Sequence, residues 1–361
     1  MANIATSAPQ AKGAAPEVHP DRTITFRFRD VNAKSVIVSL SDQNGPVPIP
    51  MTRDAGGVWS GTTPPLAPDR YSYVITSDGE TRLDPNNPIT VPNLIWQGNA
   101  ITVPGTPPEA WEVQNVPHGT VHHHFYHSDV SGDDRDFYVY TPPSYESSRR
   151  KRYPALFLLH GFSDMAGGWT DVGQAHVILD NLIAQGKILD MVVVMPLGYG
   201  LTDFASPNRS RNSDRARLNE EGFRKGLFTE VMPRAERQYR LLKGPKNTAI
   251  AGLSMGGGET LDIGINYPGT FGYVGGMSSA IPGKDAGSAF PNVDATNLNP
   301  QIKLLWIACG TSDGLIKPNR EAVKYLQDKG VKVEPVETVG AHTWMVWRRN
   351  LIEFTQKLFR G

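Results

Sequence analysis

The sequence predicts a small all-β domain followed by a larger α/β domain with a mainly parallel sheet, and three observations support this. Short alternating segments such as 23–29 and 71–75 occupy the first hundred residues, and alternation with a period of two is typical of half-buried strands. Continuous apolar runs at 155–161 and 191–196 are typical of parallel strands buried on both faces. Apolar spacings of three and four residues, as at 347–358, indicate helices that cover the sheet.

The composition is that of an ordinary globular chain with two domains. Its 361 residues are too many for one typical domain. The 36 basic and 36 acidic side chains balance, which gives no electrostatic basis for binding nucleic acid or an anionic membrane. No run approaches the ~20 apolar residues that a membrane span requires. The single cysteine, Cys309, excludes an intramolecular disulfide, and its apolar surroundings indicate a core residue.

Changes in composition divide the chain into four stretches. Residues 1–20 are rich in Ala, Pro and Ser without an apolar signal core, which predicts a disordered leader or the remainder of a removed signal peptide. Residues 21–103 form the predicted β-sandwich, 104–117 with four prolines a linker, and 118–361 the α/β domain. The leader favours a secreted or periplasmic protein, and a cytoplasmic location stays open.

A candidate nucleophile lies in the motif Gly-Leu-Ser-Met-Gly at 252–256. The motif follows the apolar segment 246–251 and precedes the helix-like segment 259–266, which is the context that the nucleophile elbow of an α/β-hydrolase requires. A serine on such a strained turn needs neighbours without a Cβ two positions away. A chance match in a glycine-rich turn is the alternative, and the strand–turn–helix context disfavours it. Ser254 is therefore the predicted nucleophile, and the α/β-hydrolase fold is the predicted architecture.

The base and the acid follow from chain order, which in this fold runs Ser, then Asp or Glu, then His. His342 is the only histidine after Ser254, and it lies in a loop between the apolar stretch 331–339 and the last helix. Among the carboxylates between them, Asp313 directly follows a predicted strand, 304–309, so it would share one rim of the sheet with the other two. His342 would take the serine proton while Asp313 fixes the imidazole tautomer.

Two backbone N–H groups are predicted to bind the oxyanion that forms during acyl transfer. In this fold they belong to the residue after the nucleophile and to the loop after an earlier strand. These positions correspond here to Met255 and Phe162. His160 precedes the serine in the chain, so we interpret it as a residue that shapes this loop.

A histidine cluster, His122, His123, His124 and His127, does not indicate a metal site. The run 120–126 is typical of a strand, so adjacent histidines point to opposite faces. No neighbouring cysteine or carboxylate pattern completes a ligand set. We therefore expect no metal and no other cofactor.

With these residues placed, the region from about residue 118 to the end resembles carbohydrate esterase family 1, the feruloyl and acetylxylan esterases, and the wider esterase D group. The matching stretches are Tyr140-Thr141-Pro142-Pro143, Leu159-His160-Gly161, Gly168-Trp169-Thr170-Asp171, Glu230-Val231-Met232-Pro233, 252–257 and Gly340-Ala341-His342. The region 21–103 resembles the early-set immunoglobulin-like modules grouped with family 48 carbohydrate-binding modules. Its matching segments are Phe26-Arg27-Phe28, 32–36, Gly57-Val58-Trp59, Tyr71-Ser72-Tyr73 and 83–88.

The resemblance implies a serine carboxylic-ester hydrolase that releases ferulate from feruloylated cell-wall polysaccharide or oligosaccharide such as arabinoxylan. An acetylxylan or general short-chain esterase with the same triad is the alternative, and a non-catalytic carbohydrate-binding protein is disfavoured by the intact triad. Trp169 and Tyr199 are predicted to flank an aromatic acyl group. The long polar loop 198–220 is expected to overhang the cleft. The N-terminal module is expected to pack on the esterase or to support a homodimer, with Trp96 as its best candidate for stacking on a sugar.

Overall fold

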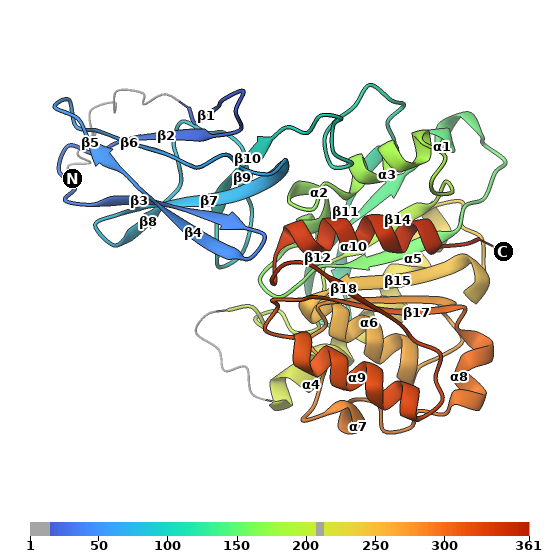
Figure 1. Cartoon of the computed structure of the whole chain (residues 1–361). Coiled ribbons are helices and arrows are strands. Elements are labelled where there is room, and N and C mark those ends of the chain that lie inside the picture. The colour runs from blue at the N-terminus through green and yellow to red at the C-terminus, as the bar shows by residue number, and fades with distance from the viewer. Residues whose placement is uncertain (1–14, 207–212, 361) are drawn as a thin grey trace, which may run out of the picture. The chain divides into compact units, whose positions relative to one another are not determined.

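The computed structural model describes residues 15–206 and 213–360, which form two compact units (Figure 1). The first unit comprises Met1–Val91 and Gln97–Glu109, and the second comprises Pro92–Trp96 and Ala110–Gly361. The chain therefore enters the second unit twice, first with a segment of five residues and then with the whole C-terminal region.

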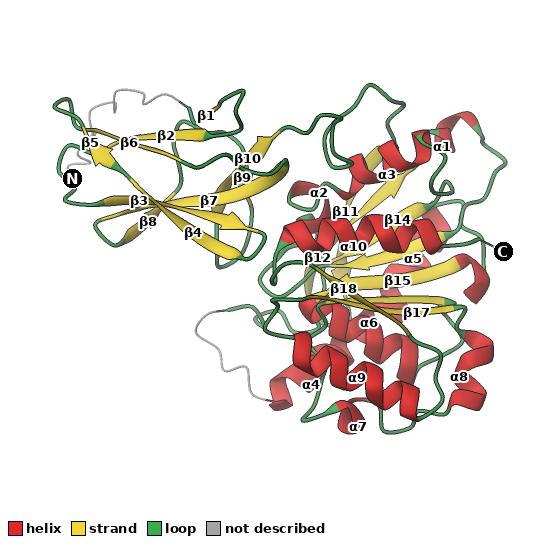
Figure 2. Cartoon of the chain, viewed as in Figure 1, coloured by secondary structure: helices red, strands yellow, loops and turns green. Residues whose placement is uncertain are grey.

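The regular elements in the described part of the first unit are all strands (Figure 2). They form one sheet in the order β1-β2-β6-β5 and another in the order β4-β3-β7-β10-β9, with β8 pairing to β7. The strands are β1 (Glu17–Val18), β2 (Ile24–Arg29), β3 (Val36–Asp42), β4 (Gly45–Pro50), β5 (Thr52–Arg53), β6 (Val58–Thr62), β7 (Asp69–Ser77), β8 (Glu80–Arg82), β9 (Thr90–Val91) and β10 (Gly98–Val103).

These two sheets pack face to face as the predicted β-sandwich. Alternate residues are buried along β2 and β7, and the rings of Phe26 and Tyr73, one from each sheet, lie 4.8 Å apart. The predicted disordered leader over 1–20 was wrong for its last residues, which are ordered. Residues 17 and 18 form β1, because β2 offers a strand edge with which they pair. Residues 1–14 lie outside the described residues.

The second unit is built on an eight-stranded sheet in the order β11-β12-β14-β13-β15-β16-β17-β18. Its strands are β11 (Thr120–Ser128), β12 (Asp133–Thr141), β13 (Ala155–Leu159), β14 (Val192–Pro196), β15 (Thr248–Leu253), β16 (Tyr273–Met277), β17 (Leu304–Gly310) and β18 (Glu334–Thr338). The six strands β13 to β18 pair with their neighbours in parallel. At one edge, β12 pairs antiparallel with both β14 and β11. The predicted, mainly parallel sheet is confirmed.

Helices cover both faces of this sheet (Figure 1). They are α1 (Ser144–Ser147), α2 (Gly168–Asp171), α3 (Ala175–Ala184), α4 (Ser213–Gly226), α5 (Met232–Gln238), α6 (Ser254–Asn266), α7 (Ala286–Ala289), α8 (Ala295–Gln301), α9 (Ile316–Asp328) and α10 (Trp344–Lys357). Alternate residues of β13 divide between two cores. Phe157 and Leu159 pack with α4 to α9, while Leu156 and Leu158 pack with α2, α3 and α10.

The predicted linker, 104–117, is divided between the two units. Residues from Ala110 belong to the second unit, because Trp111 is only 5 % exposed and the side-chain amide of Asn181 donates to the carbonyls of Ala110 and Glu112 at 2.9 and 2.8 Å. From residue 110 onward the predicted linker therefore forms part of the second unit.

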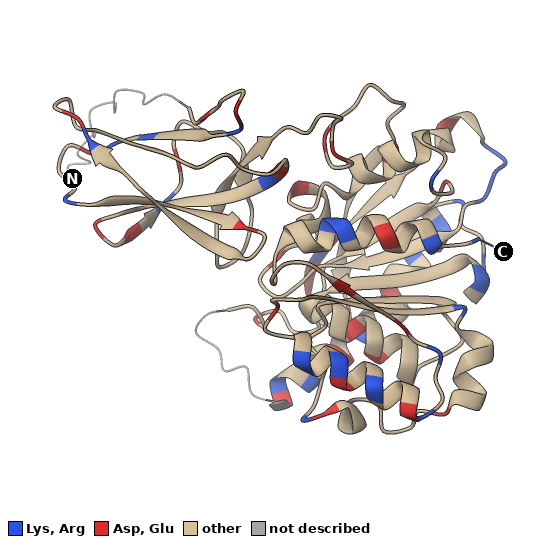
Figure 3. Ribbon diagram, in the orientation of Figure 1, with Lys and Arg blue, Asp and Glu red and all other residues tan. Residues whose placement is uncertain are grey.

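Both signs of charge are mixed along the exposed sides of α9 and α10 (Figure 3). Ion pairs one helical turn apart, such as Lys324 with Asp328 at 2.7 Å, join many of them. Across the described residues, no helix combines the length and the apolar character that crossing a membrane would need.

Candidate active site

A sharp turn between β15 and α6 presents Ser254. The φ angle of Ser254 is +53°, in the left-handed region that non-glycine residues seldom adopt. A Cβ on Gly252 would lie 2.3 Å from the carbonyl oxygen of Gly256, and a Cβ on Gly256 would lie 2.4 Å from that of His160. The flanking glycines are therefore required by close backbone approach, as the elbow motif predicts.

Ser254, His342 and Asp313 meet at the carboxyl end of the parallel strands. His342 Nε2 lies 2.9 Å from Ser254 Oγ, and His342 Nδ1 lies 2.8 Å from Asp313 Oδ2. When Nδ1–H donates to the carboxylate, the lone pair of Nε2 is left to accept the serine proton. The three predicted residues thus form one hydrogen-bonded chain.

The environment of Asp313 keeps its carboxylate ionised. Burial alone would raise the pKa of this carboxyl, but hydrogen bonds from His342 and from the backbone N–H of Leu315 at 2.8 Å hold the pKa below its ordinary value. An ionised carboxylate at this position stabilises the imidazolium that forms when His342 accepts a proton.

Trp347 and Ser278, which were not predicted from the sequence, hold the imidazole of His342 in place. The ring of Trp347 meets His342 edge to face, with centroids 4.8 Å apart, and its indole N–H donates to Ser278 Oγ at 3.1 Å. In the sequence Trp347 appeared only as one apolar position of the last helix, although its place five residues after His342 is a usable signal. Ser278 has a φ of +46° and is buried, and no local motif marks it.

The predicted oxyanion donors lie next to Ser254. Met255 occupies the first turn of α6, where unpaired N–H groups and the positive end of the helix dipole collect. The loop after β13 lies against the serine, since a Cβ on Gly161 would lie 3.3 Å from Ser254 Cβ. The side chains of Phe162 and Met255 pack into the same apolar cluster. This arrangement suits two backbone N–H groups that converge on one oxygen atom.

His160 shapes that loop, as the sequence analysis proposed. Its Nδ1 donates to the Gly161 carbonyl at 2.8 Å, and its Nε2 accepts from the Gly198 N–H at 2.8 Å. Burial lowers the pKa of His160 to about 4. The ring is therefore neutral near pH 7, and both nitrogens are occupied by the backbone.

Comparison with known families agrees with this geometry. Residues 128–358, a segment that contains Ser254, Asp313 and His342, match the family model named Esterase. The chain belongs to the Esterase family. In this esterase, residues 13–87 also match the model of carbohydrate-binding module 48, the isoamylase N-terminal domain.

Two curated relatives show what the chain is similar to. The esterase is 32% identical over 353 residues to an endo-1,4-beta-xylanase/feruloyl esterase of Xylanibacter ruminicola, across 96% of this chain and 46% of the relative. The chain thus spans slightly under half the length of that relative. It is 26% identical over 239 residues to an acetyl esterase of Caldicellulosiruptor saccharolyticus, across 56% of this chain and 83% of the relative.

Solved structures share the fold of the esterase. A ferulic acid esterase of carbohydrate esterase family 1 from Anaeromyces mucronatus has a TM-score of 0.61 at 24% identity, covering 70% of this chain and 96% of that one. The enterobactin esterase of Shigella flexneri has a TM-score of 0.69 at 18% identity, covering 96% of this chain and 97% of that one. At these identities the likeness shows the fold, and the predicted α/β-hydrolase architecture is confirmed.

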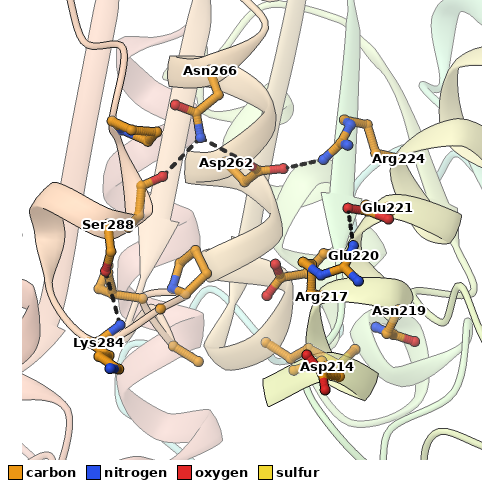
Figure 4. Close-up of a pocket in the computed structure, with 18 of the residues that line it drawn as sticks. Asp214, Arg217, Asn219, Glu220, Glu221, Arg224, Asp262, Asn266, Lys284 and Ser288 are labelled. Carbon is orange, nitrogen blue, oxygen red and sulfur yellow. Dashed lines mark hydrogen bonds and ion pairs between the residues drawn. The ribbon is translucent and has the colours of Figure 1, made fainter.

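The predicted oxyanion residues line one part of a cavity of about 760 Å³, and Figure 4 labels polar residues that line it. Phe162, Met255 and Phe204 are among its apolar lining residues. Away from them the wall becomes charged. The charged lining side chains are Asp214, Arg217, Glu220, Glu221, Arg224, Asp262 and Lys284. The cavity therefore joins an apolar part near the reacting atoms to a polar part along α4 and α6.

The two aromatic residues predicted to flank an acyl group do not line this cavity. Trp169 is fully buried, and its indole N–H donates to the Leu159 carbonyl at 2.9 Å. The prediction for Trp169 was wrong, because its side chain packs in the core shared with α3 and α10. Tyr199 is also buried, and its hydroxyl donates to the Asp164 carbonyl at 2.8 Å. It supports the loop beneath Phe162 rather than the cavity wall.

The histidine cluster lies on β11, and neighbouring rings point to opposite faces of the strand. His122 and His124 stack with centroids 6.4 Å apart, whereas His123 stacks on Tyr138. His123 and His127 each face one carboxylate, Asp136 at 2.7 Å and Asp134 at 2.9 Å. No group of three or more His, Cys, Asp or Glu residues that could hold a metal ion occurs in the described part of the chain.

The segment Pro92–Trp96, which lies between β9 and β10 in the sequence, fastens the loop that carries Phe162. The backbone N–H of Leu94 donates to the Ser163 carbonyl at 2.8 Å, and the side-chain amide of Asn93 donates to Asp164 Oδ1 at 2.8 Å. Burial raises the pKa of Asp164 to about 7. Hydrogen bonds from Asn93 and from the backbone at Gly161 oppose this rise, and the contact with Asn93 braces the oxyanion loop.

Asn93→Ala is expected to lower kcat for small esters by about tenfold with little change in KM, because slight displacement of a positioned donor costs catalysis more than binding. Steady-state kinetics with 4-nitrophenyl acetate would measure this effect. Asn44→Ala, at an exposed turn of the first unit, is the matched control. Wild-type kcat in Asn93→Ala would show that the loop holds its position without this segment.

Proposed function

We propose that this protein is a serine carboxylic-ester hydrolase that releases ferulate from feruloylated cell-wall polysaccharide. The observation that carries the proposal is the hydrogen-bonded chain from Ser254 through His342 to Asp313, set beside a cavity that starts at Phe162 and Met255. A free hydroxyl is a poor nucleophile, and this chain is the arrangement that activates it.

The mechanism follows from the positions of these groups. His342 Nε2 takes the serine proton while Ser254 Oγ attacks the ester carbonyl carbon. The oxyanion that forms is bound by the backbone N–H groups of Met255 and Phe162. Collapse of this intermediate breaks the ester bond, and His342 gives its proton to the departing sugar oxygen, which leaves as a hydroxyl. Water then attacks the acyl-enzyme by the same steps and releases the acid.

Ferulate is the proposed acyl group because two independent features favour it. The relative with 32% identity across 96% of this chain is named a xylanase/feruloyl esterase. The cavity has apolar lining residues that include Met255, the residue after Ser254, and it also has polar side chains, which suits a phenolic ring better than an acetyl group.

An acetyl esterase is the second candidate, because the similarity to the acetyl esterase of Caldicellulosiruptor saccharolyticus covers 83% of that protein. The same triad would serve both reactions, so the size of the acyl group decides between them. Secretion, action on xylan and homodimerisation through the N-terminal module stay predictions.

Hydrolysis of methyl ferulate against 4-nitrophenyl acetate tests the proposal. We expect kcat/KM for methyl ferulate to equal or exceed that for the acetate, although 4-nitrophenol is the much better leaving group. Release of ferulate from feruloylated arabinoxylan would extend the result to the polymer. Turnover of the acetate alone would assign the chain to the acetyl or general esterases.

A further inference from the structure

Glu220 is a partly buried carboxyl in the wall of the cavity, and the charge of Arg224 only partly offsets the burial and the neighbouring acidic groups. The neighbouring ions are paired with one another, Arg224 with Asp262 at 2.8 Å and Arg217 with Glu221 at 2.7 Å. Glu220 makes no side-chain hydrogen bond or ion pair among the described residues. Figure 4 shows its carboxyl directed into the space between α4 and the loop that carries Lys284.

The groups around Glu220 are mostly acidic. On α6 it faces Asp262 and Glu259, and on its own helix Arg224 and Glu221 are close. Burial, followed by the charge of Asp262, raises the pKa of Glu220 to about 7. Behind it, burial keeps the pKa of Glu259 well above its ordinary value. With Glu220 protonated, the lining holds three carboxylates, Asp214, Glu221 and Asp262, and three cations, Arg217, Arg224 and Lys284. Such a balanced site favours a neutral polar ligand over an ion.

The place of Glu220 along the cavity suits the far end of an acyl group. On α6 the lining includes Met255, Asp262 and Asn266, and a helix rises 1.5 Å per residue, so Met255 and Asp262 lie about 10 Å apart along the helix axis. An ester carbonyl bound near Met255 would place a ring, joined by a two-carbon link, with its para position beside α4 and the Glu220 carboxyl. Glu220 is partly buried, and a ligand that fills the cavity would shield its carboxyl from water, so the carboxyl would then need a partner from the ligand.

We propose that Glu220 determines acyl specificity by hydrogen-bonding the phenolic hydroxyl of a 4-hydroxycinnamoyl group. This inference rests on the proposed function, since it names the substrate class of the same site. The apolar residues Phe162, Phe204 and Met255 contact the ring, and the Glu220 carboxyl accepts a hydrogen bond from the hydroxyl at its para position. An acyl group without a para-hydroxyl leaves the Glu220 carboxyl unpaired and is therefore disfavoured.

The test compares methyl ferulate with methyl 3,4-dimethoxycinnamate, which differ in the phenolic hydrogen and one methyl group. The ratio of their kcat/KM values is measured for wild type, Glu220→Met, Glu220→Gln and Glu321→Gln. Methionine fills similar space without a strong acceptor, and we expect the ratio to fall roughly tenfold in Glu220→Met. Glutamine keeps an acceptor oxygen and should retain part of the preference. Glu321 is exposed on α9, so Glu321→Gln should keep the wild-type ratio.

Measuring the same ratio as a function of pH separates a hydrogen-bonding role of Glu220 from a purely structural one, because a structural role would not make the ratio depend on pH. A carboxylate accepts a phenolic hydrogen more strongly than a neutral carboxyl does. The wild-type ratio should therefore rise with pH through about 7, the pKa of Glu220, and should stay flat in Glu220→Gln. Effects of pH on the triad cancel in the ratio, because both esters use the same triad.

The two failures are distinguishable. If wild type hydrolyses methyl ferulate but Glu220→Met keeps the wild-type ratio, the role of Glu220 is overturned and the feruloyl esterase activity stands. If wild type hydrolyses 4-nitrophenyl acetate but not methyl ferulate, the proposed function itself fails, and the role of Glu220 fails with it.

Discussion

Ser254→Ala is expected to abolish ester hydrolysis, with kcat lower by a factor on the order of 10⁶, as when the nucleophile of a serine hydrolase is removed. Without Oγ no acyl-enzyme can form, and a water molecule near His342 Nε2 would not be held in line with the ester carbonyl as the serine oxygen is. Alanine keeps the Cβ that serine already carries at a φ of +53°, so it adds no backbone strain. Initial rates and the burst of 4-nitrophenol from 4-nitrophenyl acetate measure the effect.

The control for this substitution is Ser60→Ala, at an exposed position of β6. Both variants should melt within a few degrees of wild type, and only Ser254→Ala should lose the burst. If Ser254→Ala kept substantial turnover with a normal burst, acylation would occur on another residue and the assignment of the nucleophile would fall.

The fold was predictable where a single physical pattern dominated a segment. The continuous apolar runs at β13 and β14 and the alternation along β2 and β7 each reflect a strand in one environment. The start of α6 was harder. Its first turn contains Gly256, Gly257 and Gly258, which disfavour a helix, and the predicted helix began only at residue 259. In the structure a Cβ on Gly258 would lie 2.1 Å from the Ala280 carbonyl, so close packing of the helix against the next loop explains the glycines.

The site was predictable where chain order and a local motif carry the chemistry. The Gly-x-Ser-x-Gly motif marks Ser254, and the chain order of catalytic residues in this fold indicates Asp313 and His342. The cavity was not predictable, because Glu220 and Asp262 become neighbours only when α4 packs beside α6. The contact between Asn93 and Asp164 likewise joins positions 71 residues apart. The prediction that Trp169 contacts the acyl group was wrong for a related reason. The sequence around an aromatic residue that follows a strand does not show whether its side chain faces the cavity or the core.

Asp313→Asn is expected to lower kcat by about 10⁴ and to leave KM nearly unchanged, because the amide selects the wrong tautomer of the base. In the structure Asp313 Oδ1 accepts the backbone N–H of Leu315 at 2.8 Å, while Oδ2 faces His342 Nδ1. The Leu315 N–H would hold the amide oxygen of asparagine, which leaves the NH₂ group facing Nδ1. An NH₂ donor there requires Nδ1 to be the acceptor, so the proton moves to Nε2.

A proton on Nε2 removes the lone pair that must accept the proton of Ser254. Nitrogen-15 shifts of the His342 ring therefore report the change independently of rate: wild type should carry hydrogen on Nδ1 and Asp313→Asn on Nε2. Asp328→Asn, on the exposed side of α9, serves as the control and should change neither the rate nor the tautomer. A slow variant whose His342 keeps its hydrogen on Nδ1 would mean that Asp313 acts through its charge alone. Near wild-type turnover would mean that the carboxylate holds the turn at Leu315 without taking part in the reaction.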